Sequence, residues 1–208
     1  MSHIYLNGAT DEFTKSEMTP MYTFDYLVFI GRFQPFHLAH MQTIEIALQQ
    51  SQHVILALGS AQLERNIKNP FLATEREQMI LSNFSEQDQK RIHFVHVIDV
   101  YNDEKWVKQV KGLVNQIIQP NAKVGLIGHF KDESSYYLAL FPEWQMVELD
   151  SLKDAISATP MREAYYRGEI HTEFFPEGTV QFLTQFQKSP IYTELQKKYL
   201  TDDRSNIQ

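Results

Sequence analysis

The chain has 208 residues, with 26 Asp and Glu against 19 Lys and Arg, a net charge of −7 and no cysteine. The acidic balance argues against a nucleic-acid partner, which would need a basic face, and the lack of cysteine excludes disulfides, thiolate metal sites and a cysteine nucleophile. A chain of this length can bury the core of one domain.

The first 22 residues are polar and predict a flexible N-terminal arm. They have neither a basic start nor an apolar stretch, so they do not form a secretory signal. The longest apolar runs, such as Tyr26–Ile30, have the length of a strand, whereas a membrane span needs about 20 apolar residues. We therefore expect a cytoplasmic protein without a membrane partner.

From residue 23 onward, short apolar runs alternate with longer amphipathic stretches, which predicts an α/β fold with a five-stranded parallel sheet flanked by helices. The predicted strands are Tyr26–Gly31, His53–Gly59, Ile92–Asp99, Lys123–Gly128 and Gln145–Leu149. The predicted helices between or near them are Leu38–Gln50, Thr74–Phe84, Glu104–Gln119 and Ser134–Leu140.

Three more helices are predicted after the last strand. The first starts at Thr159-Pro160, an N-cap residue followed by proline at the first helical position, and stops at Gly168. The other two are Thr179–Gln187 and Ile191–Leu200. These last two are expected to pack on the preceding domain.

The segment from Gly31 to His40, GRFQPFHLAH, joins the first predicted strand to the first predicted helix. Ligands of open parallel sheets bind beyond the carboxyl ends of the strands, where a new helix offers free N–H groups to a phosphate. His37 and His40 would share one helix face, and Arg32 adds a permanent charge. An isolated histidine pair would be read as cap, core or metal-binding residues, but no carboxylate is near and the flanking residues favour a phosphate site.

A second segment, Ile156 to Arg162 with the sequence ISATPMR, precedes a helix after the fifth predicted strand. Its Ser157, Thr159 and Arg162 place hydroxyls and a guanidinium at a helix start, which can hold the β and γ phosphates of ATP. Alone, this segment would be an ordinary N-cap with a surface arginine. Its significance comes from its pairing with the first segment.

Together the two segments resemble the signatures of the nucleotidylyltransferase superfamily, H-x-G-H and I-S-S-T-x-x-R. Residues 60–80, 99–107 and 128–144 narrow the resemblance to nicotinamide-nucleotide adenylyltransferases of the archaeal type. The chain looks closest to the adenylyltransferase half of bacterial bifunctional proteins that also carry a Nudix hydrolase domain. It has no Nudix box, and we expect either a single-domain relative or a truncated chain.

The resemblance implies a Rossmann-like nucleotidylyltransferase domain over residues 23–170, with residues 171–208 as a C-terminal helical extension. It implies that AMP is transferred from ATP to nicotinamide mononucleotide, giving NAD and pyrophosphate, with Mg²⁺ carried by ATP and not by protein ligands. The catalytic residues implied are Arg32, His37, His40 and Arg162. The ATP-binding residues implied are Gly31, Phe33, Gln34, His37, His40, Gly128, His129, Lys131, Ser157, Thr159 and Arg162.

For the acceptor, the resemblance implies that Trp106 stacks on the nicotinamide ring and that Asn102 reads its amide. Lys68 or Arg65, in the loop before Asn69, could meet the acceptor phosphate. Trp106 could instead be the buried anchor of its helix. The acceptor phosphate is already ionised at neutral pH, because its second pKa is about 6. The reaction therefore needs positioning and charge stabilisation, and no general base.

Several alternatives remain open from the sequence. The acceptor could be nicotinic acid mononucleotide or phosphopantetheine. Ala39 replaces the glycine of H-x-G-H, which would also fit a non-catalytic nucleotide sensor. A class I aminoacyl-tRNA synthetase shares the histidine motif, but this chain is short and acidic and lacks a K-M-S-K-S-like loop. The sequence permits a homo-oligomer without specifying one.

Overall fold

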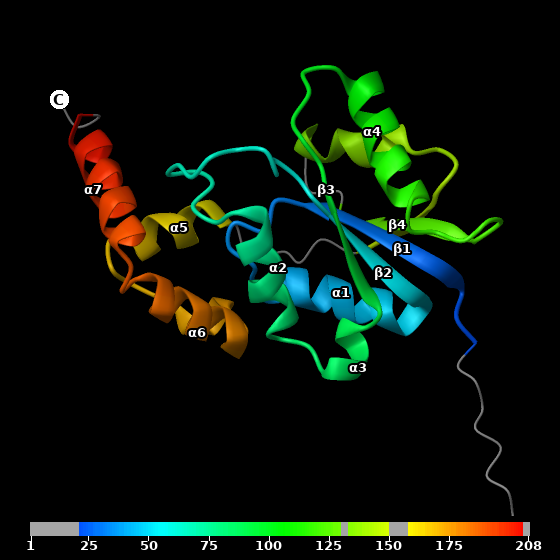
Figure 1. The fold of residues 1–208 in the computed structure, drawn as a ribbon, viewed down its shortest axis with the longest axis horizontal. Helices are drawn as coiled ribbons and strands as arrows, with labels where there is room; N and C mark the ends of the chain where they lie inside the picture. The colour runs from blue at the N-terminus through cyan, green and yellow to red at the C-terminus, as the bar shows by residue number, and fades with distance from the viewer. Residues whose placement is uncertain (1–20, 130–132, 150–157, 206–208) are drawn as a thin grey trace, which may run out of the picture.

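A computed structural model describes residues 21–129, 133–149 and 158–205 of the chain. Nearly all of the predicted N-terminal arm, together with Lys131 and Ser157, lies outside the described residues. The fold is built on a five-stranded sheet in the order β3-β2-β1-β4-β5 (Figure 1). Its strands are β1 (Phe24–Gly31), β2 (Ser51–Leu58), β3 (Ile92–His96), β4 (Val124–Gly128) and β5 (Gln145–Glu148).

All neighbouring strands of this sheet are parallel, as the sequence predicts. At its centre, Val28 of β1 pairs with Ile55 of β2 and with Leu126 of β4. The chain moves outward from β1 through β2 to β3 and then crosses back to β4 on the other side of β1. The ends of β1 and β4 therefore flank the topological switch point, where such sheets bind ligands.

Side chains alternate between the two faces of β1, so each face receives its own apolar layer. Leu27 and Phe29 belong to the core shared with α1, α2, α5, α6 and α7, whereas Val28 and Ile30 belong to the core shared with α4 and η1. The helices are α1 (Leu38–Gln50), α2 (Ala73–Leu81), α3 (Glu86–Gln89), α4 (Asp103–Asn115), η1 (Glu133–Leu140, a 3-10 helix), α5 (Ala158–Tyr166), η2 (Thr172–Phe174), α6 (Glu177–Phe186) and α7 (Pro190–Ser205).

Element boundaries differ from the prediction in a few places. α5 begins at Ala158, so Thr159 lies inside its first turn and is not the N-cap residue. β3 ends at His96 and not at Asp99, and Ser134–Leu140 belongs to a 3-10 helix. The predicted stop at Gly168 is confirmed, because this residue has φ +93° and its N–H donates to the Tyr165 carbonyl at 3.0 Å.

The C-terminal helices α6 and α7 pack beside α5 and α2 through aromatic side chains (Figure 1). The ring of Phe186 lies edge-on to Phe71, with 5.1 Å between ring centroids, and Tyr192 meets Tyr165 at 4.9 Å. The Tyr192 hydroxyl also donates to the Tyr165 carbonyl at 2.6 Å. These helices therefore share one hydrophobic core with the sheet, and the predicted domain boundary at residue 170 stays a prediction.

Among the helices of the described part, none has the length and apolar character needed to cross a membrane.

The burial of Tyr165 in α5 predicts that the protein loses stability at alkaline pH. Burial is the main cause that raises the pKa of Tyr165 above its usual value of 10.0. The unfolded chain therefore releases this proton at a lower pH than the folded protein does. The stabilisation is complete below pH 10 and falls by about 1.4 kcal/mol per pH unit above it.

Urea unfolding between pH 9 and pH 11 tests this expectation. Tyr165→Phe should lower the stability at pH 8, since the hydroxyl bonds the Leu183 carbonyl, and should also make the alkaline decline shallower. Tyr101→Phe, which removes a fully exposed hydroxyl, is the matched control. Parallel declines in the wild type and Tyr165→Phe would contradict the assignment.

Candidate active site

The turn between β1 and α1 is shaped by its own aromatic side chains. Phe33 has φ +50° and folds back over Gly31, where a Cβ would lie 2.9 Å from the Phe33 ring. The glycine is therefore required by this close approach. The buried Phe33 ring also lies edge-on to His40, with 4.8 Å between centroids.

The two motif histidines form one stacked unit at the start of α1. His37 is the N-cap residue, and its backbone N–H donates to Nδ1 of His40 at 3.3 Å. Their rings stack with 3.5 Å between centroids and 20° between planes. The ring of Phe36 also stacks on that of His40, with 5.8 Å between centroids and 17° between planes. Packing thus holds both imidazoles in fixed positions.

Both histidines line a cavity of about 190 Å³ at the switch point of the sheet. Gly31 and Gly128, at the ends of β1 and β4, line it as well. His129 also faces this cavity, and its Nε2 lies 3.3 Å from Thr43 Oγ1. The remaining lining residues are Phe29, Ile30, Ala39, Thr43, Ile127, Tyr137 and Leu138.

Ala39, which replaces the glycine of the superfamily motif, is the second residue of α1 and also lines this cavity. It is not among the described residues with positive φ. Alanine is a good helix former, so this position carries no backbone strain. The methyl group narrows the cavity without distorting the turn.

Arg162, in the first turns of α5, connects this helix to the turn between β1 and α1, here called the first turn. Its side chain is buried, its Nη1 donates to the Gln34 carbonyl at 2.8 Å, and its Nη2 donates to Thr159 Oγ1 at 3.3 Å. Burial and, next, the positive charge of Arg32 lower the pKa of Arg162. Both guanidinium groups line one cavity, and an anion bound there would relieve their repulsion.

The side chain of Gln34 has a role that the sequence did not reveal. Its Nε2 donates to the Phe71 carbonyl at 2.7 Å, and its Oε1 accepts from the Phe71 N–H at 3.1 Å. Gln34 thus braces the turn against the segment before α2. Any contact of Gln34 or of buried Phe33 with a nucleotide falls to backbone atoms.

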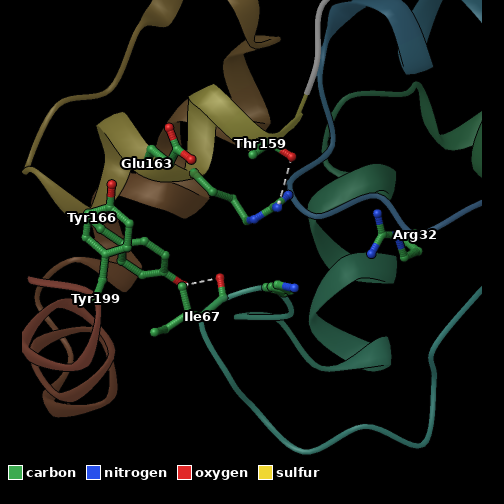
Figure 2. A pocket seen from close by; sticks show the side chains of 8 residues that line it. Arg32, Ile67, Thr159, Glu163, Tyr166 and Tyr199 are labelled. Carbon is green, nitrogen blue, oxygen red and sulfur yellow. Dashed lines mark hydrogen bonds between the residues drawn. The ribbon is translucent and has the colours of Figure 1, made fainter. Parts of the chain in front are cut away.

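A second cavity, of about 410 Å³, extends from the first turn toward the C-terminal helices (Figure 2). Arg32, Arg162 and Lys68 give it positive charge, and Thr159 adds a hydroxyl. Lys68, expected to meet the acceptor phosphate, lines this cavity with Arg32 and Arg162, and its role stays a prediction. The other lining residues are Ile67, Glu163, Tyr166 and Tyr199.

Arg76 supports the first turn from below, and sequence reasoning did not find this role. Its side chain is 1% exposed, and its Nη1 donates to the carbonyls of Arg32 and Gly59, each at 2.8 Å. Burial lowers the pKa of Arg76 to about 10. The sequence indicates a partly structural Arg76, but these two hydrogen bonds join segments far apart in the chain and no local pattern predicts them.

The predicted acceptor residues lie at the start of α4. Asn102 is the N-cap residue, and its Oδ1 accepts from the Lys105 N–H at 2.8 Å. Trp106 is half-buried and lies edge-on to Tyr137 and Phe141, each at 5.8 Å between centroids. Because Tyr137 also lines the cavity of the two histidines, Trp106 lies one ring away from it.

In the described part of the chain, no group of three or more His, Cys, Asp and Glu residues could hold a metal ion. The two cavities offer cationic and hydroxyl groups, with one carboxylate from Glu163. This chemistry suits phosphate oxygens.

Comparison with known proteins agrees with the geometry. Residues 28–191 match the family model described as cytidylyltransferase-like. The chain is 73% identical over 187 residues to the nicotinamide/nicotinic acid mononucleotide adenylyltransferase of Acinetobacter baylyi, covering 90% of this chain and 100% of that protein. It is 29% identical over 161 residues to the nicotinamide-nucleotide adenylyltransferase of Pyrococcus abyssi, covering 77% and 83% of the two chains.

Among solved structures, a bifunctional NMN adenylyltransferase/ADP ribose pyrophosphatase from Francisella tularensis matches with a TM-score of 0.78 and 34% identity. The match covers 88% of this chain and 56% of that chain, so our chain spans little more than half the length of the bifunctional protein.

The chain therefore belongs to the cytidylyltransferase-like family. Within this family it groups with the nicotinamide/nicotinic acid mononucleotide adenylyltransferases, which are nucleotidyltransferases. The predicted resemblance and fold class are thus confirmed.

The role of Arg76 gives a stability prediction. Arg76→Met should lower the free energy of unfolding by about 2–4 kcal/mol, because two buried carbonyls lose their donor. Arg76→Lys keeps the charge but lacks the planar fork, so its free energy of unfolding should lie between those of the wild type and Arg76→Met. Urea denaturation at pH 7 measures both. A loss below about 0.5 kcal/mol in Arg76→Met, the range of ordinary surface substitutions, would contradict the bracing role.

Proposed function

We propose that this protein transfers the AMP group of ATP to the phosphate of nicotinamide mononucleotide or nicotinic acid mononucleotide, giving the dinucleotide and pyrophosphate. The hydrogen bond from Arg162 Nη1 to the Gln34 carbonyl, at 2.8 Å, carries the proposal because it holds two phosphate-binding turns side by side. The 73% identity to the Acinetobacter relative supports the choice of acceptors.

In the proposed reaction, an oxygen of the ionised acceptor phosphate attacks the α phosphorus of ATP in line. A new P–O bond forms as the bond to the β-phosphate oxygen breaks, and the electron pair leaves on pyrophosphate. His37 and His40 donate hydrogen bonds to phosphate oxygens where charge develops. Arg32 and Arg162 neutralise the departing pyrophosphate, and Lys68 adds charge along the same cavity.

The proposal includes Mg²⁺ bound to the ATP phosphates. Mg²⁺ prefers oxygen ligands and keeps several waters, and the cationic cavity suits a metal that arrives with phosphate. When bound, the ion neutralises part of the phosphate charge. A Francisella tularensis structure described as a complex with AMP and a Mn ion supports a divalent cation.

The cap at α4 bears on the choice between the two acceptors. Because Asn102 Oδ1 accepts from the Lys105 N–H, the atoms left to meet a ligand are the donors on Nδ2. A donor can bond either the amide oxygen of nicotinamide or a carboxylate oxygen of nicotinic acid. We therefore infer that both mononucleotides are accepted, with their ring beside Trp106.

We also propose that the enzyme works in the cytoplasm without a nucleic-acid partner, as its acidic charge and lack of cysteine favour.

Pyrophosphate release tests the proposed function directly. Purified protein with Mg-ATP should release pyrophosphate with either mononucleotide and should not do so with phosphopantetheine. Dinucleotide formation is confirmed by chromatography. Activity only with phosphopantetheine would favour a sister enzyme, and ATP binding without turnover would favour a nucleotide sensor.

His40→Gln should lower kcat by about 10²–10³-fold, the usual cost of losing one donor to developing charge. Gln at this helix position can still accept the His37 N–H, as in a capping box, so the fold is retained. His40→Ala should be equally slow and also less stable. The assay is steady-state kinetics with thermal unfolding as the control, and near-normal turnover of His40→Gln would refute a catalytic role.

Asn102→Asp should separate the two acceptors. Asp caps a helix as well as Asn does, but it presents a carboxylate in place of the amide donors. The kcat/KM for nicotinic acid mononucleotide should fall by about 10–100-fold through charge repulsion, equivalent to about 1.4–2.7 kcal/mol. The value for nicotinamide mononucleotide should change far less. Equal losses for both acceptors would contradict direct reading by Asn102.

A further inference from the structure

The larger cavity ends on two tyrosines for which the proposed reaction gives no role. Tyr166 is the last residue of α5 and Tyr199 belongs to α7, and their rings stack with 5.2 Å between centroids and 26° between planes. The Tyr166 hydroxyl donates to the Ile67 carbonyl at 3.0 Å. The Tyr199 oxygen accepts from Arg167 Nη1 at 3.1 Å. The hydroxyl proton of Tyr166 is thus donated to the protein, and the two stacked rings, here called the aromatic wall, close this end of the cavity.

The cavity has a direction, which Figure 2 shows. Arg32 lies at one end, Tyr166 and Tyr199 lie together at the opposite end, and Thr159 lies between them. Arg32 follows directly after Gly31, which lines the cavity of the two histidines. A donor with its α phosphate at the histidines would therefore extend its β and γ phosphates past Arg32 toward the tyrosines.

The two ends of the cavity differ in how well they can stabilise a phosphate group. Phosphate oxygens are stabilised by guanidinium and hydroxyl groups, and the cavity holds those of Arg32 and Thr159 before the aromatic wall (Figure 2). The face of an aromatic ring carries partial negative charge, and it offers no donor to a phosphate oxygen. Placing a further phosphate against this wall would remove it from water without giving it a partner.

From this arrangement we propose that Tyr199, supported by Tyr166, is a specificity-determining residue that limits the donor to a triphosphate. The inference rests on the proposed function, because it takes the cavity as the site of the donor phosphates. It makes the C-terminal helix α7 part of the active site. Tyr199 is the better residue to change, since Tyr166 also bonds the Ile67 carbonyl.

The experiment compares two Mg²⁺-bound donors, ATP and adenosine 5′-tetraphosphate. Transfer of AMP releases pyrophosphate from ATP and tripolyphosphate from the tetraphosphate, and each product is measured. The wild type should strongly favour ATP. Tyr199→Ala opens the wall and should raise the ratio of kcat/KM for the tetraphosphate to kcat/KM for ATP by at least about tenfold, or about 1.4 kcal/mol. Tyr199→Phe keeps the ring and should keep the wild-type ratio.

Leu200→Ala is the matched control, since Leu200 is the next residue of α7, is 39% exposed and does not line the cavity. It should leave the ratio unchanged. If Tyr199→Ala lowers the unfolding temperature but keeps the wild-type ratio, Tyr199 is structural and the proposal is overturned. A loss of ATP affinity without a gain for the tetraphosphate would overturn it too, because the wall would then contact the adenine base.

Calorimetric binding of the two donors separates this inference from the proposed function. If no acceptor yields a dinucleotide, the proposed function fails. The role of the aromatic wall is still tested, because Tyr199→Ala should strengthen binding of the tetraphosphate relative to ATP. A tetraphosphate that binds the wild type as tightly as ATP does would refute the inference even if the proposed function holds.

Discussion

The site depends on one buried contact, the donation from Arg162 to the carbonyl of Gln34. A buried guanidinium is costly unless its donors are satisfied and its charge is paired. Here its hydrogen-bond partners are a backbone carbonyl and the hydroxyl of Thr159, while Arg32 repels its charge and the carboxylate of Glu163 offsets part of that repulsion. The hydrogen bonds are satisfied, and the three cationic side chains of the cavity outnumber its one carboxylate, which favours the binding of a strongly charged anion.

The rest of the site keeps this contact in place. Gln34 is fixed through both atoms of its amide to the backbone of Phe71, and Arg76 fixes the carbonyl of the neighbouring Arg32. On the other side, Phe33 packs over Gly31 and against His40. The turn is therefore rigid before a ligand arrives, so little ordering has to accompany binding, and preorganised donors are the most effective ones in catalysis.

The sequence predicted the parts of this molecule that follow from local pattern. Apolar runs and turn residues located all five strands, and Gly168 marked the end of α5 because a positive φ favours glycine. Roles that depend on distant contacts were missed. Neither the bracing by Gln34 and Arg76 nor the position of Tyr199 on the same cavity as Thr159 leaves a local signature, since each joins segments far apart in the chain. The assignment of Lys68 to the acceptor phosphate stays a prediction, and the cavity that it shares with Arg32 and Arg162 was not foreseen for the same reason.

Because α7 shares the hydrophobic core of the sheet and also borders the cationic cavity, occupancy of that cavity and folding of the C-terminal helices are thermodynamically linked. A donor at 100 times its dissociation constant would add about 2.7 kcal/mol to the native state. This free energy would stabilise α7 as well as the turn between β1 and α1. In the proposed function, local unfolding of α7 would therefore become rarer as the concentration of ATP rises.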